Sequence, residues 1–249
     1  MNKVLRIASI AGLIISLVNF PLSAAEDSDA QTAELTRLLK LRLGSEDVDT
    51  PVETDIPGVY QTRFGNRFGY LIDGGKYIFI GDMINLEKAQ NLTEMRRREL
   101  VIEDLAEFPV DKLIVFPATD EQLAILNVFT DTSCGYCQKL HEEVGFLQEA
   151  GISVRYFPFP RGGSRGPGYS DLKKVWCSDD KLAAMSIAKG IADGDLGSDD
   201  CADAAFVDAG YQLGNRIGIT GTPSLFAADG TKFAGYVPYQ QLIPQLLNK

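Results

Sequence analysis

Two cysteines separated by two residues are the part of this sequence best suited to chemistry. They form the run Cys134-Gly135-Tyr136-Cys137. A thiolate can attack a disulfide, and a second thiol nearby can then displace the mixed disulfide that results. The spacing predicts thiol–disulfide exchange, with Cys134 as the nucleophile and Cys137 as the resolving thiol.

The residues around this pair predict that a strand delivers it to the start of a helix. An apolar run over 123–129 has the length of a strand, and three residues that can cap a helix follow at 131–133. Four residues then recur at helical spacing and form an apolar stripe: Cys137, Leu140, Val144 and Leu147. Cys134 lies outside the stripe at the helix N-terminus, where the helix dipole and free backbone amides favour its thiolate.

Four residues are candidates for substrate contact. Gly135 and Tyr136 lie between the cysteines, and Tyr136 cannot join the stripe, so we expect it to be exposed. Pro223, directly after Thr222, starts a short run over 223–227 of strand length, a position where proline is allowed only in special geometry. If the Thr222-Pro223 bond is cis, the backbone before it can turn outward and pair with an extended peptide.

A zinc site and a static disulfide are the alternatives for the Cys134–Cys137 pair. Structural zinc takes four ligands, usually as two close pairs or with histidines. Here the other cysteines, Cys177 and Cys201, are 24 residues apart, and the only histidine is His141. The sequence therefore favours a redox pair, and we expect no metal and no organic cofactor.

Cys177 and Cys201 favour a structural disulfide that ties a helical segment together. Closing a loop of this size stabilises a fold by about 3.5 kcal/mol in the chain-entropy model. A second redox relay is the alternative, but nothing near these cysteines resembles a helix start that would stabilise a thiolate.

The N-terminus has the pattern of a cleaved secretory signal over residues 1–25. Lys3 and Arg6 precede an apolar run over 7–18, and Ser23-Ala24-Ala25 supplies small residues for cleavage. An uncleaved anchor needs about 20 apolar residues, which this run does not reach. The net charge of −10 argues against nucleic acid or anionic lipid as partners.

The rest of the chain predicts two small domains joined by a helix. Residues 26–87 combine one helix with three β-rich runs. A unit this small has little core, and its edge strand can pair with another chain, so we expect a homodimer. Residues 88–110 are helical in composition and predict a stiff linker. Residues 111–249 contain a strand-helix-strand unit, which implies a parallel strand pair, and a helical insert over about 170–218.

Several motifs together resemble the DsbC family of periplasmic thiol–disulfide isomerases. The matching runs are Phe-Thr-Asp-x-x-Cys-Gly-Tyr-Cys-x-Lys-Leu-His at 129–141, Val-Arg-Tyr-x-x-Phe-Pro-Arg at 154–161, Val-Trp-Cys at 175–177 and Gly-Thr-Pro at 221–223. The resemblance covers the C-terminal half strongly and the N-terminal half mainly by layout.

This resemblance implies a fold, partners and residue roles. The fold is an α/β thioredoxin-like domain with a helical insert, preceded by a small α+β dimerisation domain and a linker helix. The family implies a periplasmic homodimer that repairs misfolded exported proteins and is kept reduced by a membrane thiol reductase of the DsbD type. It also implies that Cys134 and Cys137 are the active pair, that Thr222 and Pro223 form a cis-proline loop facing them, and that Cys177–Cys201 is structural.

Two departures leave the deprotonation of Cys137 without an evident base. Gln138 stands where family members often carry histidine, and Val128 stands where thioredoxin has a buried acid. His141 lies roughly 10 Å along the helix from Cys134, so we expect it to pack beside the stripe. The alternatives to an isomerase are a DsbG-like reductase of oxidised single cysteines, a net oxidase, and a dimeric holdase chaperone.

Overall fold

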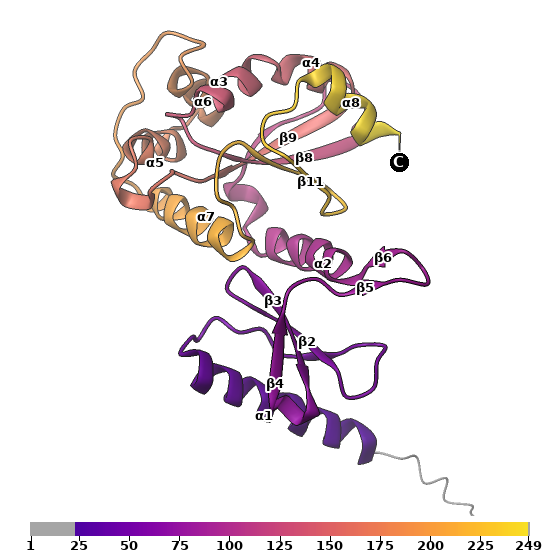
Figure 1. The fold of residues 1–249 in the computed structure, drawn as a ribbon. Helices are drawn as coiled ribbons and strands as arrows, with labels where there is room; N and C mark the ends of the chain where they lie inside the picture. The colour runs from indigo at the N-terminus through magenta and orange to yellow at the C-terminus, as the bar shows by residue number, and fades with distance from the viewer. Residues whose placement is uncertain (1–22, 249) are drawn as a thin grey trace, which may run out of the picture.

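The computed structural model describes residues 23–248, which form a small N-terminal part and a larger C-terminal part (Figure 1). Residues 1–22, which hold most of the predicted signal peptide, lie outside this range. Within the described range, no helix is both long enough and apolar enough to cross a membrane.

The N-terminal part packs one helix against a four-stranded antiparallel sheet of order β1-β2-β3-β4. Its elements are α1 (Ser23–Leu43), β1 (Val52–Glu53), β2 (Tyr60–Phe64), β3 (Arg67–Ile72) and β4 (Tyr77–Ile80). Leu35 and Leu39 of α1 pack against Tyr60 and Leu71 of the sheet. The predicted helix and three strands are confirmed, and the small size of this core follows from the few apolar residues that face it.

A β-hairpin occupies the region where the sequence predicted the linker helix to begin. The elements here are β5 (Ile84–Asn85), β6 (Gln90–Asn91) and α2 (Leu92–Glu107). Ala89 turns the hairpin with a φ of 50°, and the Asn91 side chain caps α2 by accepting from the Glu94 amide at 2.9 Å. The predicted helix over 88–110 is therefore too long, because the asparagine cap sets its start.

Helix α2 is packed against the C-terminal part and is not a free-standing rod (Figure 1). Val101 of α2 and Phe108 just beyond it join an aromatic layer with Phe129 and Phe157. The rings of Phe108 and Phe157 meet edge to face with centroids 5.3 Å apart. Apolar packing of this kind fixes α2 to the sheet of the larger part.

A buried carboxylate joins the two parts through α2. Asp104 is 3% exposed and pairs with Arg63 of β2 on one side. On the other side it pairs with Arg216 of the C-terminal part at 2.9 Å. The Asp104 carboxylate therefore contacts one arginine from the N-terminal part and one from the C-terminal part.

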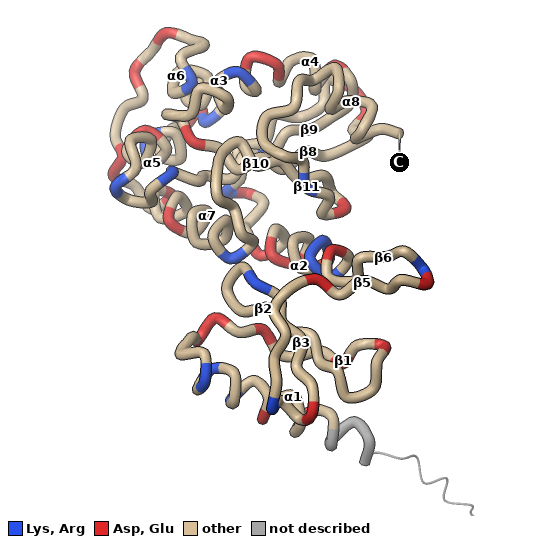
Figure 2. Tube along the Cα trace, in the orientation of Figure 1, with Lys and Arg blue, Asp and Glu red and all other residues tan. Residues whose placement is uncertain are grey.

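The basic run on α2 is neutralised on its own helix. Arg96 pairs with Glu99 at 2.9 Å, and Arg97 pairs with Glu94. Figure 2 shows basic and acidic positions interleaved along α2. This face is a mixed charged surface and does not offer an anion site.

The C-terminal part is built on a five-stranded sheet of order β11-β10-β8-β9-β7. The strands are β7 (Ile114–Phe116), β8 (Ala124–Thr130), β9 (Ile152–Pro158), β10 (Ser224–Ala227) and β11 (Lys232–Phe233). Strands β8 and β9 are parallel, as the strand-helix-strand pattern predicted, and the remaining pairs are antiparallel. The parallel pair ends at Thr130 and Pro158, so both strands deliver the chain to the same edge.

Helices cover both faces of this sheet. They are α3 (Gly135–Glu142), α4 (Val144–Glu149), α5 (Tyr169–Cys177), α6 (Lys181–Ala188), α7 (Ala205–Arg216) and α8 (Tyr239–Leu247). One face packs Leu126 and Val128 against α3, α4 and α8, and the other packs the aromatic layer against α2 and α7. The predicted single helix over 135–150 is divided at Glu143, whose carboxylate accepts hydrogen bonds from the Tyr236 hydroxyl and the Tyr239 amide.

Candidate active site

The Cys134–Cys137 pair lies at the start of α3, directly after the turn that leaves β8. Cys134 is the N-cap residue, with extended φ and ψ of −93° and 114°, and Gly135 begins the helix. The Cys137 amide donates to the Cys134 carbonyl at 2.9 Å. Cys137 is fully buried at the head of the predicted stripe, so the helix start and the stripe are confirmed.

The two sulfurs sit in different electrostatic environments. The pKa of Cys134 is lowered to about 5, chiefly by a hydrogen bond from the Cys137 thiol, with further contributions from Thr222, the Cys137 amide and the charge of Arg161. Burial raises the pKa of Cys137, and its hydrogen bond to Cys134 raises it further. At neutral pH the pair therefore holds one thiolate and one thiol, both as free cysteines.

The loop before β10 covers the Cys134 sulfur. The Thr222-Pro223 peptide bond is cis, and the Thr222 carbonyl lies 3.2 Å from Cys134 Sγ. The buried Thr222 hydroxyl has no other hydrogen-bond partner among the described residues, so it can donate to the Cys134 thiolate, whose pKa it helps to lower. Cys134 is only 3% exposed, and the loop that covers it is the one that the family resemblance places opposite the cysteines.

Tyr136 is the exposed member of the turn, as predicted. Its side chain is 64% exposed and stacks on Tyr236 with ring centroids 5.8 Å apart. Lys139 places its ammonium 4.9 Å from the centroid of the Tyr236 ring. Gly135 has open space around the position of an added Cβ. These groups form an aromatic surface next to the buried sulfurs.

Asp131 organises the turn that carries Cys134. Its fully buried carboxylate accepts from the Arg161 amide and Nε at 2.9 and 3.0 Å, and from the Ser133 amide and hydroxyl at 2.9 and 2.8 Å. Burial alone would raise the pKa of Asp131, but the hydrogen bonds from Arg161 and Ser133 hold it below its ordinary value. The sequence marks Asp131 only as a residue that can cap a helix, because its partner Arg161 lies 30 residues away.

Two other basic side chains, His141 and Lys189, lie near the turn. His141 is buried, and its ring nitrogens lie 2.9 Å from the Tyr156 hydroxyl and 3.1 Å from the Ser186 hydroxyl. Burial, with help from the charge of Lys189, lowers the pKa of His141 to about 4, so the ring is neutral and packs beside the stripe as expected. Lys189, from the helical insert, is buried behind the turn and was not identified from the sequence.

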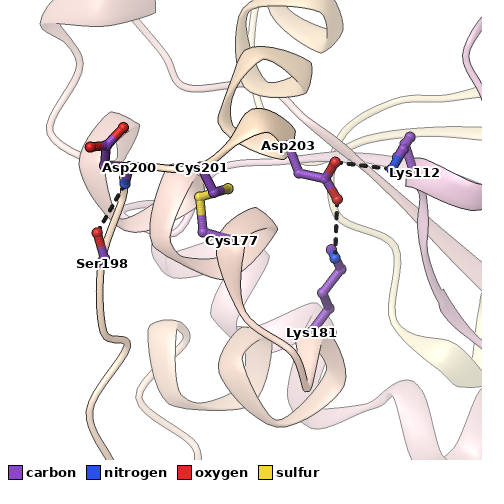
Figure 3. Close-up of a disulfide and its surroundings, with 7 residues drawn as sticks. All are labelled: Lys112, Cys177, Lys181, Ser198, Asp200, Cys201 and Asp203. Carbon is purple, nitrogen blue, oxygen red and sulfur yellow. Dashed lines mark hydrogen bonds and ion pairs between the residues drawn. A yellow bond between two sulfur atoms is a disulfide. The ribbon is translucent and has the colours of Figure 1, made fainter.

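Cys177 and Cys201 form a disulfide, with their Cα atoms 5.7 Å apart (Figure 3). The bond joins the end of α5 to the segment that leads into α7. Close by, Asp203 pairs with Lys112 at 2.9 Å and with Lys181 at 3.3 Å. The disulfide and the Lys181 pair tie the insert together internally, and the Lys112 pair attaches it to the segment before β7.

The described residues contain no group of three or more His, Cys, Asp or Glu side chains placed to hold a metal ion. What they do contain is a thiolate and a thiol in one helical turn, facing a cis proline at the edge of a mixed sheet. Together, these features define a thiol–disulfide oxidoreductase.

Comparison with known proteins identifies the family within this class of enzymes. Residues 110–249 match the family model of a thioredoxin-like domain, and residues 25–94 match that of the disulfide bond isomerase protein N-terminal domain. The chain is 30% identical over 238 residues to the thiol:disulfide interchange protein DsbC of Dickeya dadantii, covering 94% of this chain and 93% of the relative. The chain belongs to the DsbC family of thiol:disulfide interchange proteins.

A second curated relative fits the same assignment, and one solved structure is reported beside it. The DsbC protein of Escherichia coli K12 is 29% identical over 233 residues, covering 90% of this chain and 91% of the relative. The solved structure of a disulfide interchange protein from Neisseria gonorrhoeae has a TM-score of 0.48 and 24% identity, covering 56% of this chain and 98% of that chain.

Proposed function

We propose that this chain is a periplasmic disulfide isomerase that repairs wrong disulfides in exported proteins. The single observation that carries the proposal is that the two thiols of one turn have different pKa values. The lowered pKa of Cys134 supports its role as nucleophile, and the raised pKa of Cys137 supports its role as a thiol that acts only in a later step.

The reaction begins when the Cys134 thiolate attacks one sulfur of a substrate disulfide. A bond forms between Cys134 and that sulfur, and the other substrate sulfur leaves as a thiolate. In isomerisation, a substrate thiolate then displaces Cys134 and forms the correct disulfide, so no net oxidation or reduction occurs. In the reductive exit, Cys137 displaces the substrate, and the Cys134–Cys137 disulfide forms while the substrate is reduced.

The substrate would lie across the cis-proline loop and the exposed face of the turn. The cis bond at Thr222-Pro223 supports pairing of an extended peptide beside Cys134. The exposed, stacked ring of Tyr136 supports apolar contact with unfolded segments. Gly135 leaves room for a chain to approach the sulfur.

The N-terminal part is proposed to form the homodimer. Strand β4 lies at the edge of its sheet, and Tyr77, Phe79 and Ile80 on it are more than half exposed. An open apolar edge of this kind favours pairing with a second copy. The signal pattern over residues 1–25 and the family membership support a periplasmic location, where a DsbD-type membrane reductase would keep the cysteines reduced.

The test is the repair of a multi-disulfide protein whose disulfides have been scrambled. The reduced wild-type chain should restore its activity without net oxidation, and Cys134→Ala should abolish this repair. Cys137→Ala should accumulate mixed disulfides through Cys134. Repair that persists in Cys134→Ala would refute the proposal, and full protection of cells by that variant would favour a holdase.

A further inference from the structure

A buried lysine behind the active-site turn has no part in the reaction described so far. Lys189 follows α6 in the helical insert and is 2% exposed. Its ammonium donates to the Thr130 hydroxyl and to the Asp131 carbonyl, each at 2.7 Å. Burying a lysine is costly, and two neutral oxygen acceptors compensate only part of that cost.

Within residues 23–248, no carboxylate forms an ion pair with Lys189. The nearest acid, Asp131, gives Lys189 its backbone carbonyl, while its carboxylate is held by Arg161 and Ser133. The titratable groups around Lys189 come from three directions: Cys134, Cys137 and His141 of the α3 segment, Asp131 after β8, and Arg161 after β9. Lys189 therefore presents a positive charge to the sulfur side of the site.

The charge of Lys189 acts more strongly on Cys137 than on Cys134. Among the effects that lower the pKa of Cys137, the charge of Lys189 is the largest, although burial outweighs it. For Cys134 the corresponding cation is Arg161. Burial lowers the pKa of Lys189 itself to about 8, and the neighbouring sulfurs oppose that effect. Lys189 thus acts mainly on Cys137, and Arg161 acts mainly on Cys134.

His141 and Val128 cannot stabilise the Cys137 thiolate in this way, and the charge of Arg161 acts on Cys134 more than on Cys137. Both ring nitrogens of His141 are engaged by hydroxyl groups, and its ring is neutral. Val128, on the strand below, is fully buried and apolar. Cys137 itself is fully buried, so its thiolate gains little from water.

We infer that Lys189 is a positioning residue for the resolving step, in which its buried positive charge stabilises the Cys137 thiolate. The inference rests on the proposed roles of Cys134 and Cys137. In the mixed disulfide, the Cys137 thiol gives its proton to water and its sulfur attacks Cys134 Sγ. The Cys134–Cys137 bond forms, the bond to the substrate breaks, and the substrate sulfur leaves as a thiolate that takes up a proton from water. Lys189 keeps its charge throughout.

Ellman's reagent separates the two steps in the reduced full-length chain. Attack by Cys134 releases one thionitrobenzoate and leaves a mixed disulfide, and attack by Cys137 releases the second. In Lys189→Gln the second release should slow about tenfold at pH 7, the effect of one pKa unit on thiolate population. Its pH midpoint should move upward, while the first release stays within about twofold.

Two variants provide the controls. Lys189→Arg keeps the charge and should keep the second release within about threefold of wild type. Lys181→Gln removes the same charge from the first residue of α6, where the lysine pairs with Asp203 at 3.3 Å, and should behave as wild type. If Lys189→Gln does not fold, Lys189→Met removes the charge in its place.

The outcomes separate this inference from the proposed function. An unchanged second release in a folded neutral variant would overturn the role of Lys189, and so would equal slowing in Lys189→Arg and Lys189→Gln. A wild-type chain that gives no second release, or Cys134→Ala that keeps the first, would instead refute the roles of the cysteines.

Discussion

Replacing Asp131 with alanine tests whether one buried carboxylate holds the active-site turn together. Four hydrogen bonds reach this carboxylate, two from Arg161 and two from Ser133. Breaking a buried charged pair costs about 3–5 kcal/mol, because the partner groups are left unsatisfied. The Arg161 side chain is 44% exposed and regains water, which reduces the loss. We therefore expect Asp131→Ala to lower the free energy of unfolding by about 3 kcal/mol.

The same variant should make Cys134 more acidic. With Asp131 gone, Arg161 is no longer neutralised and its charge acts fully on the thiolate, whose pKa it already lowers. Stability and thiol acidity should thus change in opposite directions: the chain unfolds more easily while Cys134 ionises at lower pH. Urea unfolding measures the first effect, and the thiolate absorbance near 240 nm measures the second.

The difference in unfolding free energy between wild type and Asp131→Ala should also depend on pH. The pKa of Asp131 is lowered in the folded state, so its contribution is complete above the pKa of an unfolded aspartate, about 4. It is lost as the pH falls through the lowered folded pKa. Wild type and Asp131→Ala should therefore differ by a constant amount near neutral pH and converge in strong acid.

Asp203→Ala is the matched control for this prediction. The Asp203 carboxylate pairs with two cations, Lys112 and Lys181, but its side chain is 23% exposed. Replacing Asp203 with alanine should lower the free energy of unfolding by about 1 kcal/mol or less. An unfolding midpoint for Asp131→Ala no lower than that of Asp203→Ala would refute the reasoning, since the buried, four-bonded carboxylate would then contribute no more than the partly exposed one.

Three further changes have expected outcomes. The 240 nm absorbance of the reduced chain should titrate with a midpoint at about 5 for Cys134, and the stabilisation that its thiolate gives the reduced form should grow from that pH upward; a midpoint near 8 would contradict the hydrogen-bonded thiolate. Gly168→Ala would place a Cβ 2.1 Å from the Asp131 carboxylate and should destabilise the chain by about 1–3 kcal/mol in urea unfolding. Its control is Gly145→Ala, which meets open space in α4 and should stabilise by up to about 1 kcal/mol. Removing the disulfide by replacing both Cys177 and Cys201 with alanine should cost about 3.5 kcal/mol of unfolding free energy and leave the first reaction of Cys134 with Ellman's reagent unchanged.

Local patterns were enough to predict the turn that carries Cys134 and Cys137. Cys137 continues a stripe of helical spacing, so its burial follows from period alone. The end of an apolar strand before Cys134 likewise placed that residue at a helix start. These features depend on residues within a few turns of each other, where sequence and structure are tightly coupled.

The groups that set the charges of the site could not be predicted in this way. Arg161 and Lys189 reach Asp131 from 30 and 58 residues away, and nothing in their own neighbourhoods marks them as partners. The hairpin ending at Asn91 was missed for another reason: its composition is helical, and the competing signal was a single capping side chain.

The packing of α2 sets a limit on exchanging halves between relatives. The two family models end at residue 94 and begin at residue 110, so most of α2 belongs to neither. Yet Val101 and Phe108 complete the aromatic layer over Phe129 and Phe157, and Asp104 holds Arg216. A chimaera that took α2 from another parent would replace one wall of the C-terminal part, and a junction before Leu92 keeps that wall only if the new N-terminal part supplies Asp104 with a cation in place of Arg63.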